Sequence, residues 1–166
     1  MPYKKHKFSA GFTIVELFIA LAIMALLLAA VATAFNASAI NFRENEGIFK
    51  AVTAARNALV LMTSQIRTGI LDPTDLSQTT CTLQCADGSN VTYRYISGEK
   101  KLYLHNNDTN TDYVLCENVT AMTFLKDKDN NTPPDIKSVQ ITITVESNNT
   151  QQTLSAAAVV RRVLSQ

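Results

Sequence analysis

The residues with the clearest chemical potential stand at the beginning of a long apolar segment. Gly11 is followed by Phe12, and Glu16 is the only charged residue from Phe12 to Phe35. Glycine has no side chain, so the peptide bond after Gly11 suits a narrow protease site. Cleavage there would free a positive α-amino group on Phe12, within one helical turn of Glu16. Because a carboxylate inside an apolar helix is costly, we interpret Glu16 as the partner of such an amine.

The apolar segment has the length of a membrane-spanning helix. From Phe12 to Phe35 there are 24 residues. As a helix they extend about 36 Å, enough to cross a hydrocarbon core of roughly 30 Å. Lys4, Lys5 and Lys7 precede the segment, and basic residues favour the cytoplasmic side of a membrane. The sequence therefore predicts one span, with a cytoplasmic amino terminus and an exported domain.

Three interpretations explain this amino-terminal region. A secretory signal peptide would be cleaved after Ala30-Val31-Ala32, but its apolar region would be unusually long and would contain Glu16 without a purpose. An uncleaved signal anchor explains the length and leaves Glu16 equally unexplained. A leader that ends at Gly11, followed by a retained helix, gives Glu16 a partner in the Phe12 amine of a neighbouring subunit.

Residues 11–22, Gly-Phe-Thr-Ile-Val-Glu-Leu-Phe-Ile-Ala-Leu-Ala, resemble the leader signature of the type IV pilin and type II secretion pseudopilin superfamily. In that family a membrane-embedded prepilin peptidase cuts after the glycine and methylates the new terminal phenylalanine. The resemblance implies cleavage between Gly11 and Phe12, N-methylation of Phe12, and an assembly role for Glu16.

The resemblance also implies partners and a location. The partners are other minor and major pilin-like subunits, the prepilin peptidase and an inner-membrane assembly platform, and no cofactor is implied. The chain would lie in the inner membrane, with a cytoplasmic leader and a periplasmic carboxy-terminal domain. After assembly it would lie in a periplasmic pseudopilus or a cell-surface pilus, in head-to-tail contact with its neighbours.

A minor subunit at or near the fibre tip is favoured over a major one. Many major pilins carry a proline near the middle of the apolar helix, where it lets the helix bend, and this chain has none between Pro2 and Pro73. The downstream sequence resembles J-type minor pseudopilins and W-type minor pilins. That resemblance lies in residues 91–95, 117–124, 134–143 and 160–162, which begin Val-Thr-Tyr, Glu-Asn-Val, Pro-Asp-Ile and Val-Arg-Arg.

The helix is predicted to continue beyond the membrane span. Six apolar residues recur at steps of four and three and form one stripe: Ile48, Val52, Ala55, Leu59, Met62 and Ile66. Such a stripe packs against a sheet of its own domain more often than it forms a coiled coil. Gly47 marks a weak point, Gly69 a stop, and Pro73 confirms the stop. We therefore predict one helix from Phe12 to Thr68.

After Asp72 the chain alternates short β-rich runs with clusters of Asn, Asp, Gly and Ser. Residues 87–90 and 97–99 are predicted turns, so the early strands form antiparallel hairpins. The fold class is α+β, a long amino-terminal helix packed on an antiparallel β-sheet, as the pilin resemblance implies. Its parts are a leader (1–11), a membrane half of the helix (12–35), an amphipathic half (36–70) and a sheet domain (71–166). The predicted strands are Thr80–Cys85, Val91–Ile96, Leu102–His105, Val114–Cys116, Ala121–Leu125, Ser138–Val145 and Thr153–Val163.

Three cysteines, Cys81, Cys85 and Cys116, follow the apolar helix, and an exported domain favours a disulfide between two of them. In an extended strand Cys81 and Cys85 would lie about 13 Å apart, too far to bond. They pair only if residues 82–84 form a turn; otherwise one of them pairs with Cys116. Zinc is the weaker alternative because no histidine lies nearby.

Asp127, Asp129 and Asn131 have the spacing that begins a calcium-binding loop, and Asp135 would add an oxygen ligand. Thr132 stands where such loops need glycine, so a solvated hairpin loop is the favoured interpretation. No metal site is therefore predicted.

The rest of the sequence predicts no chemistry. His6 and His105 have no partner that the sequence alone can place, so both are interpreted as surface histidines. No phosphate-binding loop, nucleophile elbow or metalloprotease helix occurs. With a net charge of +1 and small basic clusters, the chain is not expected to bind nucleic acid. We expect an assembly protein rather than an enzyme; the rival is a membrane-anchored periplasmic binding module or enzyme with an ordinary signal anchor.

Overall fold

The computed structural model describes residues 11–128, 135–148 and 150–161. Within these ranges a single helix is followed by eight strands, and the chain divides into two compact units between Arg43 and Glu44. Helix α1 (Ile14–Thr68) contributes to both units, and every described strand belongs to the second. The predicted α+β class, a long amino-terminal helix with antiparallel strands, is confirmed.

The first unit contains the apolar half of α1. The helix begins at Ile14, two residues later than predicted, and is uninterrupted to Thr68. Every described residue from Gly11 to Glu46 is exposed, although the run up to Phe35 contains a single charge. Among the described residues, α1 alone is long and apolar enough to cross a membrane.

In the second unit, α1 buries one stripe of its surface. The predicted stripe is confirmed at its carboxy-terminal end, while Ile48 and Val52 are only half-buried. Gly47 is not a weak point, because the helix continues through it. A Cβ atom there would lie 2.5 Å from Ser147 Oγ, so glycine allows the helix to approach this end of the domain. The buried residues of α1 are Ala51, Ala55, Ala58, Leu59, Met62 and Ile66.

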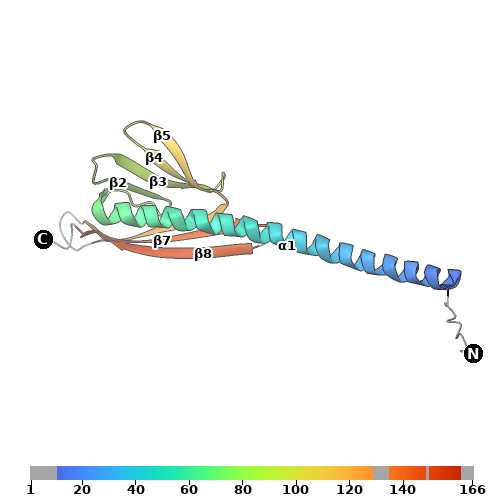
Figure 1. The fold of residues 1–166 in the computed structure, drawn as a ribbon. Helices are drawn as coiled ribbons and strands as arrows, with labels where there is room; N and C mark the ends of the chain where they lie inside the picture. Colours follow the sequence, from blue (N-terminus) through green and yellow to red (C-terminus); the bar gives the residue numbers. More distant parts are fainter. Residues whose placement is uncertain (1–10, 129–134, 149, 162–166) are drawn as a thin grey trace, which may run out of the picture. The chain divides into compact units, whose positions relative to one another are not determined.

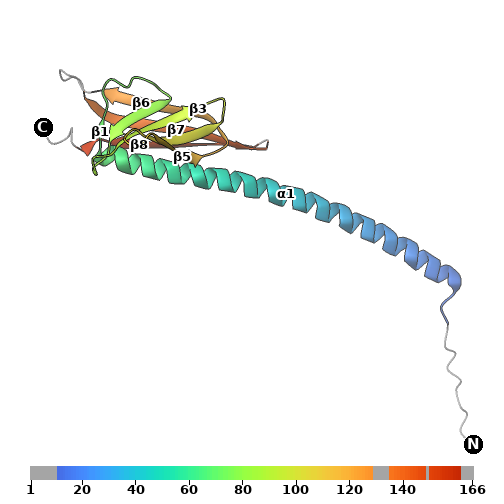
Figure 2. The same cartoon turned by 90° about the horizontal axis from the view of Figure 1, so that it is seen from above.

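The strands form two antiparallel sheets rather than the one sheet that was predicted. Five strands pair in sequence order in the first sheet, and three pair in sequence order in the second. Figure 2 shows both sheets on one side of the second half of α1. The first sheet contains β1 (Ile70–Leu71), β2 (Thr80–Gln84), β3 (Asn90–Ile96), β4 (Lys101–Asn106) and β5 (Thr111–Cys116). The second contains β6 (Val119–Lys128), β7 (Ile136–Ser147) and β8 (Thr150–Val159), of which β7 and β8 are labelled in Figure 1.

All seven predicted strands are present, and β1 was missed. Strand β1 has two residues, too few for a repeating pattern of burial. Strand β8 ends at Val159 instead of Val163, and residues 162–166 lie outside the described ranges. The division into two sheets was not predicted because strand pairing is a contact between distant residues, and burial patterns within each strand do not reveal it.

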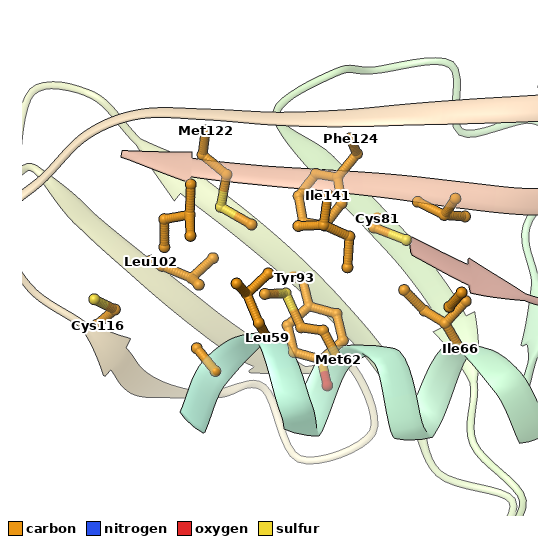
Figure 3. Packing of buried hydrophobic residues seen from close by; sticks show 14 of the residues in the cluster. Leu59, Met62, Ile66, Cys81, Tyr93, Leu102, Cys116, Met122, Phe124 and Ile141 are labelled. Carbon is orange, nitrogen blue, oxygen red and sulfur yellow. The ribbon is translucent and has the colours of Figure 1, made fainter. Parts of the chain in front are cut away.

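The core lies between α1 and the inner faces of both sheets. Figure 3 shows Leu59, Met62 and Ile66 of α1 directed toward side chains from β2, β3, β6 and β7. Tyr93 is fully buried and donates its hydroxyl to Gln65 Oε1 on α1. Burial raises the pKa of Tyr93, so the donor stays protonated. The largest fully buried side chains are Tyr93, Phe124, Met62, Ile66, Leu83, Leu102, Ile141 and Ile143.

Gly69 ends the helix, as predicted, at a point where a side chain has no room. Its N–H donates to the Gln65 carbonyl at 2.8 Å. A Cβ atom on Gly69 would lie 2.8 Å from the backbone oxygen of Gln84 and 2.9 Å from Leu83 Cδ1. Because one of these neighbours is backbone, the contact cannot be relieved by a side-chain rotation. The stop therefore depends on tertiary packing as well as on glycine's helix-ending character.

We predict that Gly69→Ala lowers the free energy of unfolding by about 1–3 kcal/mol through overpacking. The measurement is denaturant unfolding of the full chain in detergent micelles. Gly98→Ala is the matched control, because a Cβ atom at Gly98 meets nothing within 4 Å. Equal unfolding midpoints for the two variants would contradict this explanation.

A buried ion pair joins the loop between β1 and β2 to the second sheet. Lys126 Nζ lies 3.0 Å from Asp75 Oδ1 and donates to the Asp75 carbonyl at 2.7 Å. Asp75 also accepts from Thr80 Oγ1 and from the Thr82 N–H, each at 2.9 Å. The side chains are only 10% and 6% exposed for Asp75 and Lys126. Burial raises the pKa of Asp75, but the bonds from Lys126 and Thr80 outweigh it and hold that pKa below its usual range.

Asp75→Asn should destabilise the domain by about 3–5 kcal/mol at neutral pH, because Lys126 would lose its buried partner. A lowered carboxyl pKa gives stability above the pKa of the unfolded chain, about 3.9, and that stability is lost as pH falls. The wild-type chain should therefore lose stability steeply below about pH 4, and Asp75→Asn should flatten that loss. Asp127→Asn, at an exposed carboxylate on β6, is the control; an identical pH profile for all three proteins would refute the assignment.

Candidate functional site at the amino-terminal end of the helix

Thr13 determines where α1 begins. Its side-chain Oγ1 accepts a hydrogen bond from the Glu16 N–H at 3.2 Å, and its carbonyl accepts from Leu17 N–H at 3.2 Å. These bonds identify Thr13 as the N-cap residue and Glu16 as the third residue of the helix, the spacing of a capping box. Thr13 was not among the residues predicted to have a role, although Thr-x-x-Glu before an apolar run is a recognisable start signal.

The cap leaves Gly11, Phe12 and Thr13 outside the helix. All three are exposed, and Phe12 is 81% exposed. A protease must bind its substrate backbone in an accessible form, and here the Gly11–Phe12 bond is accessible without unwinding a helical turn. The predicted cleavage bond therefore lies before the first residue of the helix, so that cleavage there would leave α1 intact.

Glu16 lies in the first turn of α1, where a carboxylate complements the positive end of the helix dipole. It is exposed and surrounded along the helix by exposed apolar side chains, including Phe18, which is 67% exposed. An apolar surface of this extent needs lipid or neighbouring protein around it. In that environment a positive amine facing the carboxylate would be attracted far more strongly than in water.

The three cysteines do not form a second site. Residues 82–84 belong to β2, so the turn that a Cys81–Cys85 bond requires is replaced by extended strand. All three cysteines are free thiols in the structure. Cys81 and Cys116 are buried in the core, and burial raises the pKa of Cys81 to about 12 and that of Cys116 to about 11. These two buried thiols are therefore protonated at neutral pH, which makes them inert.

The calcium motif is only partly described. Asp127 lies in β6, opposite Ser138 of β7, and Asp135 stands just before β7. Asp129 and Asn131 lie outside the described residues. Within the described residues, no three His, Cys, Asp or Glu side chains are grouped as a metal site would require.

His105 has an acidic partner that sequence analysis could not place. Its Nδ1 lies 2.8 Å from Asp112 Oδ1, across the β4–β5 hairpin. Asp112 also accepts from Arg94, whose guanidinium lies 5.9 Å from the centre of the Tyr103 ring. The pairing depends on strand register, which is why spacing along the chain did not reveal it. His6 lies outside the described residues.

Comparison with known proteins gives one match. Residues 6–32 match the family model for the prokaryotic N-terminal methylation motif. No curated protein and no solved structure matches the chain. The matched segment contains Gly11, Phe12, Thr13 and Glu16. The match supports a type IV pilin-like precursor that is processed by a prepilin peptidase and assembles with other pilin subunits. It therefore supports the resemblance to the type IV pilin and pseudopilin superfamily.

Proposed function

We propose that this chain is a minor pilin-like subunit, at or near the tip of a type II secretion pseudopilus or a type IV pilus. It acts by assembly and not by catalysis. The observation that carries the proposal is the geometry of the helix start. The accessible Gly11–Phe12 bond lies immediately before the Thr13 cap, and Glu16 lies in the first turn inside the matched motif.

The mechanism follows from the charges at this end. Prepilin peptidase cuts after Gly11 and methylates the new amine of Phe12. The precursor waits in the inner membrane with its sheet domain in the periplasm, where the apolar side chains of α1 are surrounded by lipid. During assembly the Glu16 carboxylate meets the Phe12 amine of a neighbouring subunit, and each charge offsets the desolvation cost of the other.

The minor role is supported by the continuity of α1. A helix without proline from Ile14 to Thr68 has no built-in site for local melting. Among the described residues of the sheet domain, those that are fully buried are all hydrophobic, as expected of a structural core. A subunit of this kind contributes surfaces to a fibre.

The first test is the mass of the mature amino terminus, measured on protein purified from a host with a prepilin peptidase. We expect a chain that begins at N-methylated Phe12. A chain beginning at Thr33 would indicate an ordinary signal peptide, and an intact Met1 would indicate a signal anchor. Either result would exclude the proposal and favour an anchored periplasmic module.

The second test separates the charge of Glu16 from its place in the helix cap. Glu16→Gln keeps a residue type that fits the capping box and removes the charge, whereas Glu16→Ala removes both. We expect both variants to be cleaved and methylated normally, and both to enter fibres at least about tenfold less than wild type, as loss of a buried charge pair implies.

The control is Glu44→Ala, which removes another exposed glutamate from the same helix and should leave incorporation unchanged. Incorporation is measured by immunoblotting of sheared fibres against total membrane protein. Normal incorporation of Glu16→Gln would show that the charge has no role in docking.

A further inference from the structure

An open groove lies between α1 and the last strand of the first sheet. Its volume is about 550 Å³. One wall is the part of α1 that carries Gly47, Ala51 and Ala54, and the other is formed by residues 114–118, from the end of β5 to the turn before β6. The three α1 residues follow steps of four and three, so they share one side of the helix. None of the three has a side chain larger than a methyl group, and together they span about 10 Å of helix.

The charged residues at the groove are already paired within the domain. Lys50 Nζ lies 2.7 Å from Glu46 Oε1. On the opposite wall, Glu117 Oε1 lies 2.8 Å from Lys101 Nζ. The other residues that line the groove are uncharged. An uncharged occupant therefore meets no unpaired charge here, whereas a charged one would have to compete with an existing ion pair.

Much of the surface inside the groove is apolar. Ala51 and Cys116 are almost completely buried, so they form its floor. Burial keeps the Cys116 thiol protonated, and the floor therefore carries no charge. Val114, on the β5 wall, is 47% exposed. Uncharged polar groups come from Asn118 and Ser147. The groove is therefore suited to apolar side chains that enter from outside the domain.

The apolar half of a pilin-type helix is a surface that needs such a groove. In this chain it contains one charge between Phe12 and Phe35, and it is exposed throughout. Lipid surrounds this surface in the membrane, but a subunit that has entered a fibre has left the lipid. Protein from neighbouring subunits must then cover it. The motif that residues 6–32 match includes most of this segment, so partners that carry the same motif bring the same kind of helix.

Head-to-tail assembly brings that helix to the level of the groove. Subunits in such a contact have the same orientation, so their helices run in the same direction. From the middle of the apolar half to Ala51 is about 40 Å along α1. A neighbour displaced by this distance, away from the membrane, places its own apolar half beside Ala51. The exposed part of α1 ends at Glu46 and the groove begins at Gly47, so the two surfaces follow one another along the same helix.

We propose that this groove is a docking site for the apolar amino-terminal helix of a neighbouring pilin-like subunit, oriented parallel to α1. The small residues of α1 let the incoming helix approach closely. Its larger apolar side chains fill the space between α1 and β5. The inference rests on the proposed function, because only a subunit of a fibre has such a neighbour. It adds a contact made by the sheet domain to the contact made by Glu16.

The first test is photocrosslinking in the native host, where the partner subunits are present. The photoreactive amino acid p-benzoylphenylalanine replaces Val114, which is exposed on the wall of the groove, and in a control chain it replaces Thr123, which is exposed on β6. Mass spectrometry of the crosslinked peptides identifies the partner and the segment in contact. We expect the Val114 variant to crosslink to the apolar amino-terminal helix of a pilin-like subunit, with a yield at least about tenfold above that of the control.

The second test fills the groove. Ala54→Trp places an indole in the space that the incoming helix needs, and incorporation into sheared fibres should fall at least about tenfold, as the loss of one buried apolar side chain implies. Thr123→Trp is the matched control and should enter fibres like wild type. Denaturant unfolding checks that Ala54→Trp keeps the wild-type midpoint; if it does not, the crosslink from Val114 decides the question.

Several results would overturn the proposal. They are normal incorporation of Ala54→Trp, a Val114 crosslink yield no higher than that of the control, and Val114 crosslinks only to sheet domains or to proteins without a pilin-type helix. The outcome is distinguishable from failure of the proposed function, which the mass of the mature amino terminus and the Glu16 variants test. A chain that is methylated at Phe12 and enters fibres through Glu16, but gives no helix crosslink from Val114, would refute only the groove contact.

Discussion

The folded unit depends on burying one stripe of α1 beneath two sheets. Met62 and Ile66 are fully buried there, and each such side chain contributes about 1.5–3 kcal/mol. Alanines at 51, 55 and 58 let the strands approach the helix closely, while Tyr93 fixes its position by bonding to Gln65. Neither sheet could bury its inner face alone, because each has only one layer. Removing the helix would expose the apolar faces of both.

The same helix meets two different environments along its length. Up to Glu46 every described residue is exposed, although the side chains are mostly apolar as far as Phe35. From Ala51 onward, the apolar stripe is buried by the chain's own strands. The amino-terminal half therefore requires a surrounding that the chain does not supply, and the carboxy-terminal half does not. This difference explains why charge is rare in the amino-terminal half, and it supports the proposal that Glu16 pairs with a group on another molecule.

Much of the fold was predictable because it depends on the spacing of residues within short stretches of the sequence. The steps of four and three from Ala55 to Ile66 predicted the buried face of α1. The helix end at Thr68 followed from Gly69. The helix start was two residues off because the cap at Thr13 was overlooked. Three features could not be predicted from the sequence, because each joins residues that are brought together only by strand pairing. They are the division into two sheets, the Asp75–Lys126 pair and the His105–Asp112 pair.

For the candidate site, the amino-acid sequence alone determined the chemistry. Gly11, Phe12 and Glu16 lie within six consecutive residues, so their spacing is fixed by the covalent chain and by the helical repeat. Tertiary structure decided which surfaces remain open for contact. Within the described residues, strand β8 is an open edge because sheet order places it outermost, whereas the edge of β6 is covered by a loop about fifty residues earlier in the chain. Local spacing can specify a processing site, but an edge is defined by what does not pair with it, and that depends on the whole domain.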